Sequence, residues 1–266
     1  MEIPIIQVDA FADAVFGGNP AAVCPLLDFP PDELLLSIAA ENNLSETAFL
    51  VPVPGRYRLR WFTPTMEVDL CGHATLATAH VVFTRLRPED DTVAFETRSG
   101  LLDVTRNGDL LTMSFPSLPA TVGAAPAELL AALGEPAPRE IHVVPRLHGA
   151  DDFMLVYGSS QEVAQLRPDF SRVHANVIAT AVGDGGIEAP DFVSRFFAPA
   201  SGINEDPVTG SSHCTLAPYW AGVLGKATLV GRQISQRGGT VRCELRDERV
   251  LLSGRCVDYL VGTISV

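Results

Sequence analysis

Two apolar helix-forming segments, each preceded by the same pattern of residues, place the strongest constraint on the fold of this chain. The first segment follows residues 61–64 (Trp-Phe-Thr-Pro) and begins near Gly72. The second follows residues 196–199 (Phe-Phe-Ala-Pro) and begins near Gly210. In each case an aromatic strand, a proline and an acidic turn lead to a glycine where the helix begins. The two prolines are about 135 residues apart, so the sequence predicts a weak internal repeat.

The pattern around these segments predicts an α+β fold. Residues 74–83 and 215–224 are apolar on nearly every face, and helices of that kind have to be buried. Helices are also expected at 31–42 and 127–133. Gly and Pro separate short strand-like runs at 4–10, 47–53, 58–62, 93–97 and 110–115, and strands dominate 233–265. We therefore expect two similar halves, each a curved, mostly antiparallel sheet or barrel around one central helix.

The chain length agrees with that division. A chain of 266 residues fits one large domain or two small ones. The proline-containing stretch near 118–119 suggests a first half at residues 1–117 and a second half at 118–266. A site that lies between these halves, facing both helix starts, is the arrangement we expect.

Composition narrows the classes of partner and compartment. The chain has 19 Lys and Arg against 32 Asp and Glu, a net charge of −13, which argues against nucleic acid or an anionic membrane as partner. No signal-like start and no apolar run of roughly 18 residues is present. The five cysteines are odd in number and include no Cys-x-x-Cys pair. We expect a cytoplasmic protein.

The helix starts favour an anionic ligand. A helix N-terminus presents unpaired amides and a partial positive charge, and glycine lets a ligand approach the backbone. Gly72, Thr209, Gly210 and Ser212 are therefore candidate binding positions for a small carboxylate substrate. Alternatively, the glycines only permit tight turns.

Titratable residues gather near the same positions. His73 follows Gly72, while Asp206 and Ser211 flank the second start. Glu46 precedes an apolar strand, where partial burial would raise its pKa toward the range of a general base. The alternatives are a core histidine at 73, a helix cap at 206 and a surface glutamate at 46.

Several blocks, in order along the chain, carry a resemblance to a known family. They are residues 8–11 (Val-Asp-Ala-Phe), 17–21 (Gly-Gly-Asn-Pro-Ala), 45–49 (Ser-Glu-Thr-Ala-Phe), 61–64, 67–75 (Glu-Val-Asp-Leu-Cys-Gly-His-Ala-Thr) and 205–213 (Glu-Asp-Pro-Val-Thr-Gly-Ser-Ser-His). Together they span nearly the whole chain and resemble the PhzF-like phenazine-biosynthesis family. That family belongs to the fold group of diaminopimelate epimerase and proline racemase.

The resemblance implies an enzyme that moves protons without a cofactor. It implies that Glu46 is the acid/base residue, that His73, Asp206 and Ser211 are further polar site residues, and that Gly72 and Gly210 are backbone positions at the helix starts. It also implies a homodimer and allows the last strand, after about residue 255, to return to the first half. The best-known family activity isomerises a dihydro-hydroxyanthranilate. We therefore expect an isomerase that acts on a small carboxylate.

Two alternatives stay open at this point. Cys71 stands where the thiol branch of the fold group has a catalytic cysteine, but the second position is Thr209, so only a one-thiol epimerase or dehydratase is possible. A non-catalytic carboxylate-binding protein is the other alternative. Neither a metal nor a cofactor is expected, because no metal-binding spacing, dinucleotide fingerprint or nucleophile elbow is present.

Overall fold

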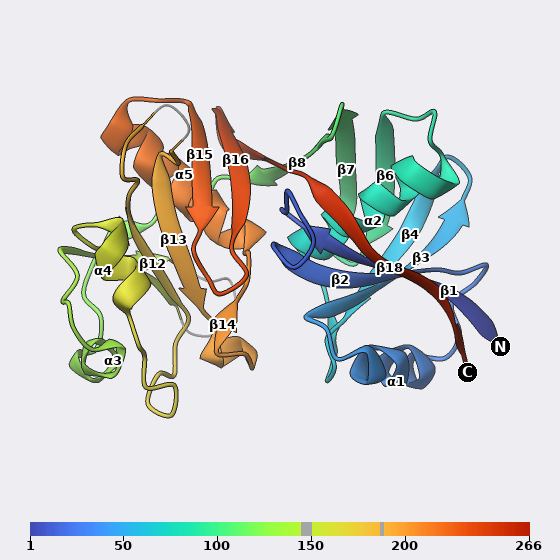
Figure 1. Cartoon of the computed structure of the whole chain (residues 1–266), viewed down its shortest axis with the longest axis horizontal. Helices are drawn as coiled ribbons and strands as arrows, with labels where there is room; N and C mark the ends of the chain where they lie inside the picture. Colours follow the sequence, from blue (N-terminus) through green and yellow to red (C-terminus); the bar gives the residue numbers. More distant parts are fainter. Residues whose placement is uncertain (145–150, 187–188) are drawn as a thin grey trace. The chain divides into compact units, whose positions relative to one another are not determined.

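The computed structural model describes residues 1–144, 151–186 and 189–266, and the chain divides into two compact units (Figure 1). The first unit comprises Met1–Ser114 and Ser253–Val266, and the second comprises Phe115–Leu252. The C-terminal residues join the first unit because β18 pairs antiparallel with β1, from Glu2 opposite Ser265 to Ala10 opposite Cys256. The predicted boundary at 117–118 lies three residues beyond the division between the units at 114–115, and the resemblance had allowed the last strand to return to the first half.

The first unit contains a mostly antiparallel sheet and two helices. Its strands are β1 (Glu2–Ala10), β2 (Asn19–Pro25), β3 (Glu46–Val53), β4 (Arg56–Phe62), β5 (Glu67–Val68), β6 (Thr92–Thr97), β7 (Gly100–Asn107), β8 (Leu110–Pro116) and β18 (Cys256–Ser265). Its helices are α1 (Asp32–Asn42) and α2 (Gly72–Val81), and α2 continues as a π-helical turn over Val82–Leu86. Strand pairs β2–β3 and β4–β6 are parallel, while β1–β2, β3–β4, β6–β7 and β7–β8 are antiparallel.

The second unit repeats that succession of pairings. Its strands are β9 (Thr121–Val122), β10 (Glu140–Val144), β11 (Asp152–Val156), β12 (Val177–Val182), β13 (Phe192–Phe197), β14 (Glu205–Asp206), β15 (Thr228–Gln233), β16 (Gly239–Arg246) and β17 (Arg249–Gly254). Its helices are α3 (Ala127–Leu133), α4 (Ser160–Gln165), a 3₁₀ turn at Pro199–Ser201, and α5 (Gly210–Leu224). Pairs β11–β12 and β13–β15 are parallel, and β10–β11, β12–β13 and β15–β16 are antiparallel.

The two long apolar helices differ in burial. In α2 all residues except Gly72 and His80 are buried, as its apolar sequence predicts. In α5 burial covers the first two turns except Ser211, and also Trp220, while Val223 is 57% exposed, so the expectation of a wholly buried helix is wrong at its C-terminal end. Pro218 lacks the N–H that would bond to Cys214 O in a regular helix, and the Leu118 amide donates to that carbonyl instead.

The predicted α+β class is confirmed, and the four expected helices all form. In α1 the acidic residues Asp32 and Glu33 occupy the first turn, and Asn43 ends the helix with a left-handed φ of 48°. The apolar residues of α1 face a core of β-strand residues that includes Phe49 and Phe62. No helix among the described residues is long and apolar enough to span a membrane.

Candidate active site

Each long helix begins from an extended residue followed by a glycine. Cys71 (φ −143°) precedes Gly72 at the start of α2, and Thr209 (φ −114°) precedes Gly210 at the start of α5. Neither cap side chain bonds to a first-turn amide. The first amides at both starts are therefore not capped by these side chains and retain the donor capacity and positive dipole end that favour an anion.

The acidic turn before each helix is fixed by an arginine from the preceding aromatic strand. Arg60 on β4 makes a bidentate ion pair with Glu67, at 2.8 and 2.7 Å. Arg195 on β13 makes the same pair with Glu205, at 2.8 Å for both contacts. Each guanidinium also lies about 5 Å from the ring of the phenylalanine two residues further on. The side chain of Arg195 is 11% exposed, and its ion pair with Glu205 anchors the loop before α5.

In the first unit, folding brings Glu46 to the start of α2. The Oε2 atom of Glu46, at the start of β3, lies 3.0 Å from Nε2 of His73. Both atoms are buried, and neither makes a well-aligned hydrogen bond with a described residue. The other ring nitrogen, Nδ1, lies 3.2 Å from the side-chain amide of Asn19, whose oxygen accepts from Ser45 Oγ at 3.1 Å. Asn19 thus holds the His73 imidazole at Nδ1, and the Glu46 carboxylate lies close to Nε2.

Glu46 and His73 each shift the pKa of the other. Burial raises the pKa of Glu46, but the neighbouring His73 and a hydrogen bond from Cys71 lower it, and the net shift is downward. Burial lowers the pKa of His73, but Cys71 and Glu46 raise it, and the net shift is well upward. The sequence-based expectation that Glu46 would have a raised pKa is therefore wrong, because the interactions with His73 and Cys71 outweigh burial. The downward shift favours an ionised Glu46 carboxylate near neutral pH.

Cys71 completes this cluster. Its Sγ atom lies 3.6 Å from Nδ1 of His73. Burial, and then the charge of Glu46, raise the pKa of the Cys71 thiol to about 11. The thiol is therefore protonated near neutral pH, which makes it a weak base beside an ionised carboxylate.

In the second unit, a buried glutamine fixes the start of α5. Gln233, at the end of β15, accepts from the Thr209 amide at 2.9 Å and donates to Asp206 O at 2.7 Å and to Thr209 Oγ1 at 3.3 Å. The hydroxyl of Thr209 donates to the Asp206 carboxylate. Gln233 is wholly buried, and the sequence carried no local signal that it would bond to this turn.

The predicted residues at the start of α5 divide by exposure. The hydroxyl of Ser212 is buried and donates to Thr209 O at 2.8 Å, so its proton is not available to a ligand. Ser211 is exposed, and no described residue accepts a hydrogen bond from the amides of Gly210 or Ser211. His213 donates from Nδ1 to Thr209 O at 2.7 Å, and burial lowers its pKa to about 4, which keeps the ring neutral. Ser211 and the first amides thus provide the available donors here.

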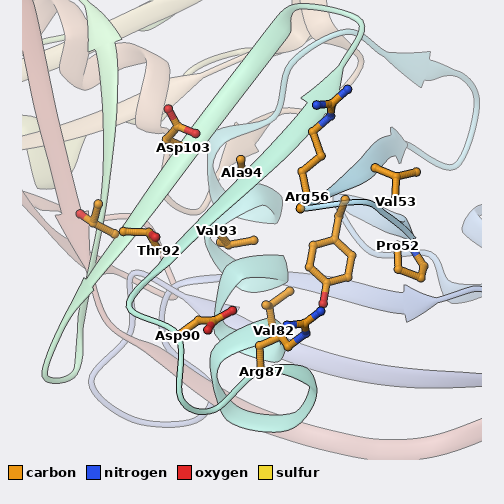
Figure 2. A pocket seen from close by; sticks show the side chains of 13 residues that line it. Pro52, Val53, Arg56, Val82, Arg87, Asp90, Thr92, Val93, Ala94 and Asp103 are labelled. Atoms are coloured by element: carbon orange, nitrogen blue, oxygen red, sulfur yellow. The ribbon is translucent and has the colours of Figure 1, made fainter.

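A separate hollow of about 490 Å³ lies over the first unit's sheet (Figure 2). Figure 2 shows Arg87 and Asp90 near Val82, at the π-helical turn, and Arg56 at the other end. The Arg56 guanidinium pairs with Glu96 at 2.8 Å. None of the predicted site residues lines this hollow. It is therefore distinct from the Glu46–His73 cluster.

Comparison with known proteins identifies the family of the chain. Residues 8–262 match the PhzC–PhzF family, described as phenazine biosynthesis-like protein. The chain belongs to this family. A Pseudomonas aeruginosa protein named an uncharacterized isomerase is 50% identical over 264 residues, covering 99% of both chains. Because full-length relatives at 41–50% identity are named isomerases, the chain is an isomerase of the PhzF family.

Solved structures agree with this assignment. A crystal structure of a PhzF-family phenazine biosynthesis protein from Enterococcus faecalis is 42% identical, with a TM-score of 0.93 and full coverage of both chains. A hydroxyproline epimerase from Agrobacterium vitis, solved with bound trans-4-hydroxy-L-proline, is 13% identical, with a TM-score of 0.56 over 99% of this chain and 91% of that one. The second similarity shows the fold alone, which is that of the epimerase-like group.

Proposed function

We propose that this PhzF-family isomerase moves a proton on a small carboxylate-bearing substrate, without a cofactor, and that Glu46 carries the proton. One observation supports this most strongly: an ionised, buried carboxylate lies 3.0 Å from a buried imidazole, and the two facing atoms lack aligned hydrogen bonds. Unsatisfied buried polar atoms are costly, and they persist where a ligand completes them.

In the proposed mechanism, Glu46 removes a proton from an activated carbon and returns one to a different carbon of the same conjugated unit. His73 stabilises the carboxylate before the transfer, and its Nε2 proton is available to the substrate afterwards. A positioned acid/base group of this kind contributes about 10²–10⁴-fold in rate. Electrostatic stabilisation of the developing enolate by helix-start amides would increase the rate further.

We further propose that helix-start donors bind carboxylate groups of the substrate. Gly72 offers its amide in the first unit, and Gly210 with the exposed Ser211 offers amide or hydroxyl donors in the second. Asp206 and Thr209 would orient the start of α5, since they bond to each other and to Gln233. Ser212 contributes its amide, because its hydroxyl proton bonds to Thr209 O.

The test is solvent exchange in D₂O. A panel of small unsaturated carboxylates is incubated with the protein, and loss of C–H signals is followed by NMR. We expect Glu46→Gln to abolish exchange into any compound the native protein labels. Glu41→Gln, an exposed change of the same kind on α1, is the control and should exchange normally. Full exchange by Glu46→Gln would refute the assignment.

A one-thiol mechanism is the second candidate, because Cys71 contacts the imidazole. Its pKa of about 11 weighs against it as the base. Cys71→Ser separates the two mechanisms, since loss of exchange in this variant but not in Glu46→Gln would assign the base to the thiol. A non-catalytic binding protein would be stabilised by carboxylates yet never label them.

A further inference from the structure

The cluster at the start of α2 has the composition of a transition-metal site. Glu46, Cys71 and His73 each offer one ligand atom, and these three atoms lie within 4.8 Å of one another. They bring an oxygen, a sulfur and an imidazole nitrogen from β3 and from two positions around the α2 start. The spacing in the sequence did not indicate a metal, because Glu46 lies far from the other two along the chain.

We propose that these three side chains bind one zinc-type divalent cation, which inhibits the enzyme by occupying Glu46. Thiolate and imidazole ligands select zinc, cobalt or copper over magnesium and calcium, which prefer oxygen. Three protein ligands leave a fourth tetrahedral position open to water or to the substrate carboxylate.

The three ligand atoms lie close enough to reach this coordination after small side-chain movements. With bonds of about 2.3 Å to sulfur and about 2.0–2.1 Å to nitrogen and oxygen, tetrahedral ligand atoms lie ~3.4–3.6 Å from one another. The carboxylate lies 3.0 Å from Nε2, closer than this spacing, and the thiol lies 3.6 Å from Nδ1, so the two face different nitrogens of the ring and one of them has to move. Because no pair of the three atoms exceeds 4.8 Å, side-chain rotations of ~1 Å suffice to close the site around either ring nitrogen.

Burial also favours an ion in this place. Cys71 and His73 are 7% and 6% exposed, and the Glu46 side chain is 16% exposed, so water competes weakly for the ligands. Asn19 contacts Nδ1 of His73 and orients the ring, as outer partners of metal-bound histidines do, which leaves Nε2, the nitrogen that faces Glu46, for the metal. Binding must displace the thiol proton, so affinity rises with pH.

Cobalt(II) is the probe, because its bond to a thiolate produces a near-ultraviolet charge-transfer band that needs no enzyme activity. Titration of the full-length protein should saturate at one equivalent and produce this band, and zinc should abolish it. Cys71→Ser should remove the band and weaken binding at least ~10–100-fold, the loss reported for even the outer partners of a metal site. Cys24→Ser, another buried cysteine of the first unit, is the matched control and should keep the band.

The cobalt band tests the metal site independently of which residue is the catalytic base. A band that persists in Cys71→Ser, or no band in the folded native protein, would overturn it. Inhibition of deuterium exchange by zinc rests on the proposed function of Glu46. If cobalt binds with the expected ligands but zinc leaves exchange unchanged, the metal site stands and the catalytic assignment of Glu46 fails.

Discussion

Gln233 gives the sharpest test of how the start of α5 is built. Its buried side-chain amide bonds to the Thr209 amide, to Asp206 O and to Thr209 Oγ1. In Gln233→Glu the acceptor toward the Thr209 amide survives, but an ionised carboxylate would face the Asp206 carbonyl. A protonated carboxyl can still donate to that carbonyl. The folded state therefore favours the protonated form and raises the pKa of the new glutamate.

The magnitude follows from proton linkage. An unfolded glutamate has a pKa of about 4.3, so with a raised folded pKa the variant is most stable below that value and loses stability as pH rises. Between the two pKa values the loss is about 1.4 kcal/mol per pH unit. Because the total free energy of unfolding is about 5–15 kcal/mol, the loss over two pH units is readily measured.

Urea denaturation of Gln233→Glu between pH 6 and 8 provides the assay. We expect its free energy of unfolding to fall with pH more steeply than that of the native protein, by up to about 1.4 kcal/mol per unit. Gln161→Glu, on the exposed surface of α4, should follow the native slope. A variant at position 233 with the native slope would refute the argument, because it would mean that the carboxylate is solvated there.

Three further outcomes are expected. In urea denaturation, Gly18→Ala should destabilise the first unit by several kcal/mol, since Gly18 has a φ of +65° and the new Cβ would lie 2.2 Å from Ala10 O. Gly55→Ala is the control: its φ is +75° but the space is open, so it should cost only about 1–2 kcal/mol. Arg195→Ala should lower the free energy of unfolding by roughly 2 kcal/mol, because it leaves a partly buried carboxylate unpaired. The acidic limb of the exchange–pH profile should move to higher pH in His73→Gln, because His73 lowers the pKa of Glu46; an unchanged limb would contradict that coupling.

Much of the fold could be predicted because it depends on local pattern. The apolar residues of α1 and α2, and the alternation of β4, gave the elements their correct type. By contrast, the start of β2 at Asn19 depends on pairing with β1 and β3, which is not local. The return of β18 to β1 also depends on distant pairing.

The candidate site divides in the same way. Residue types near the two helix starts identified Glu46, His73 and Ser211, but the direction of the Glu46 pKa shift depends on a neighbour that only folding supplies. The ion pair of Arg195 with Glu205 also depends on folding, because it joins β13 to β14. Gln233 could not be found from sequence, because its partners lie about 25 residues away and no motif surrounds it.

A crystal structure of the Glu46→Gln variant with a labelled carboxylate trapped in it would test the central claim most directly. The account predicts that the side chain at position 46 lies ~3–3.5 Å from the carbon that exchanges its proton, with the ligand carboxylate on helix-start amides. Contradiction would be a ligand whose exchanging carbon lies against Cys71 Sγ, or one seated in the hollow between Arg56 and Arg87.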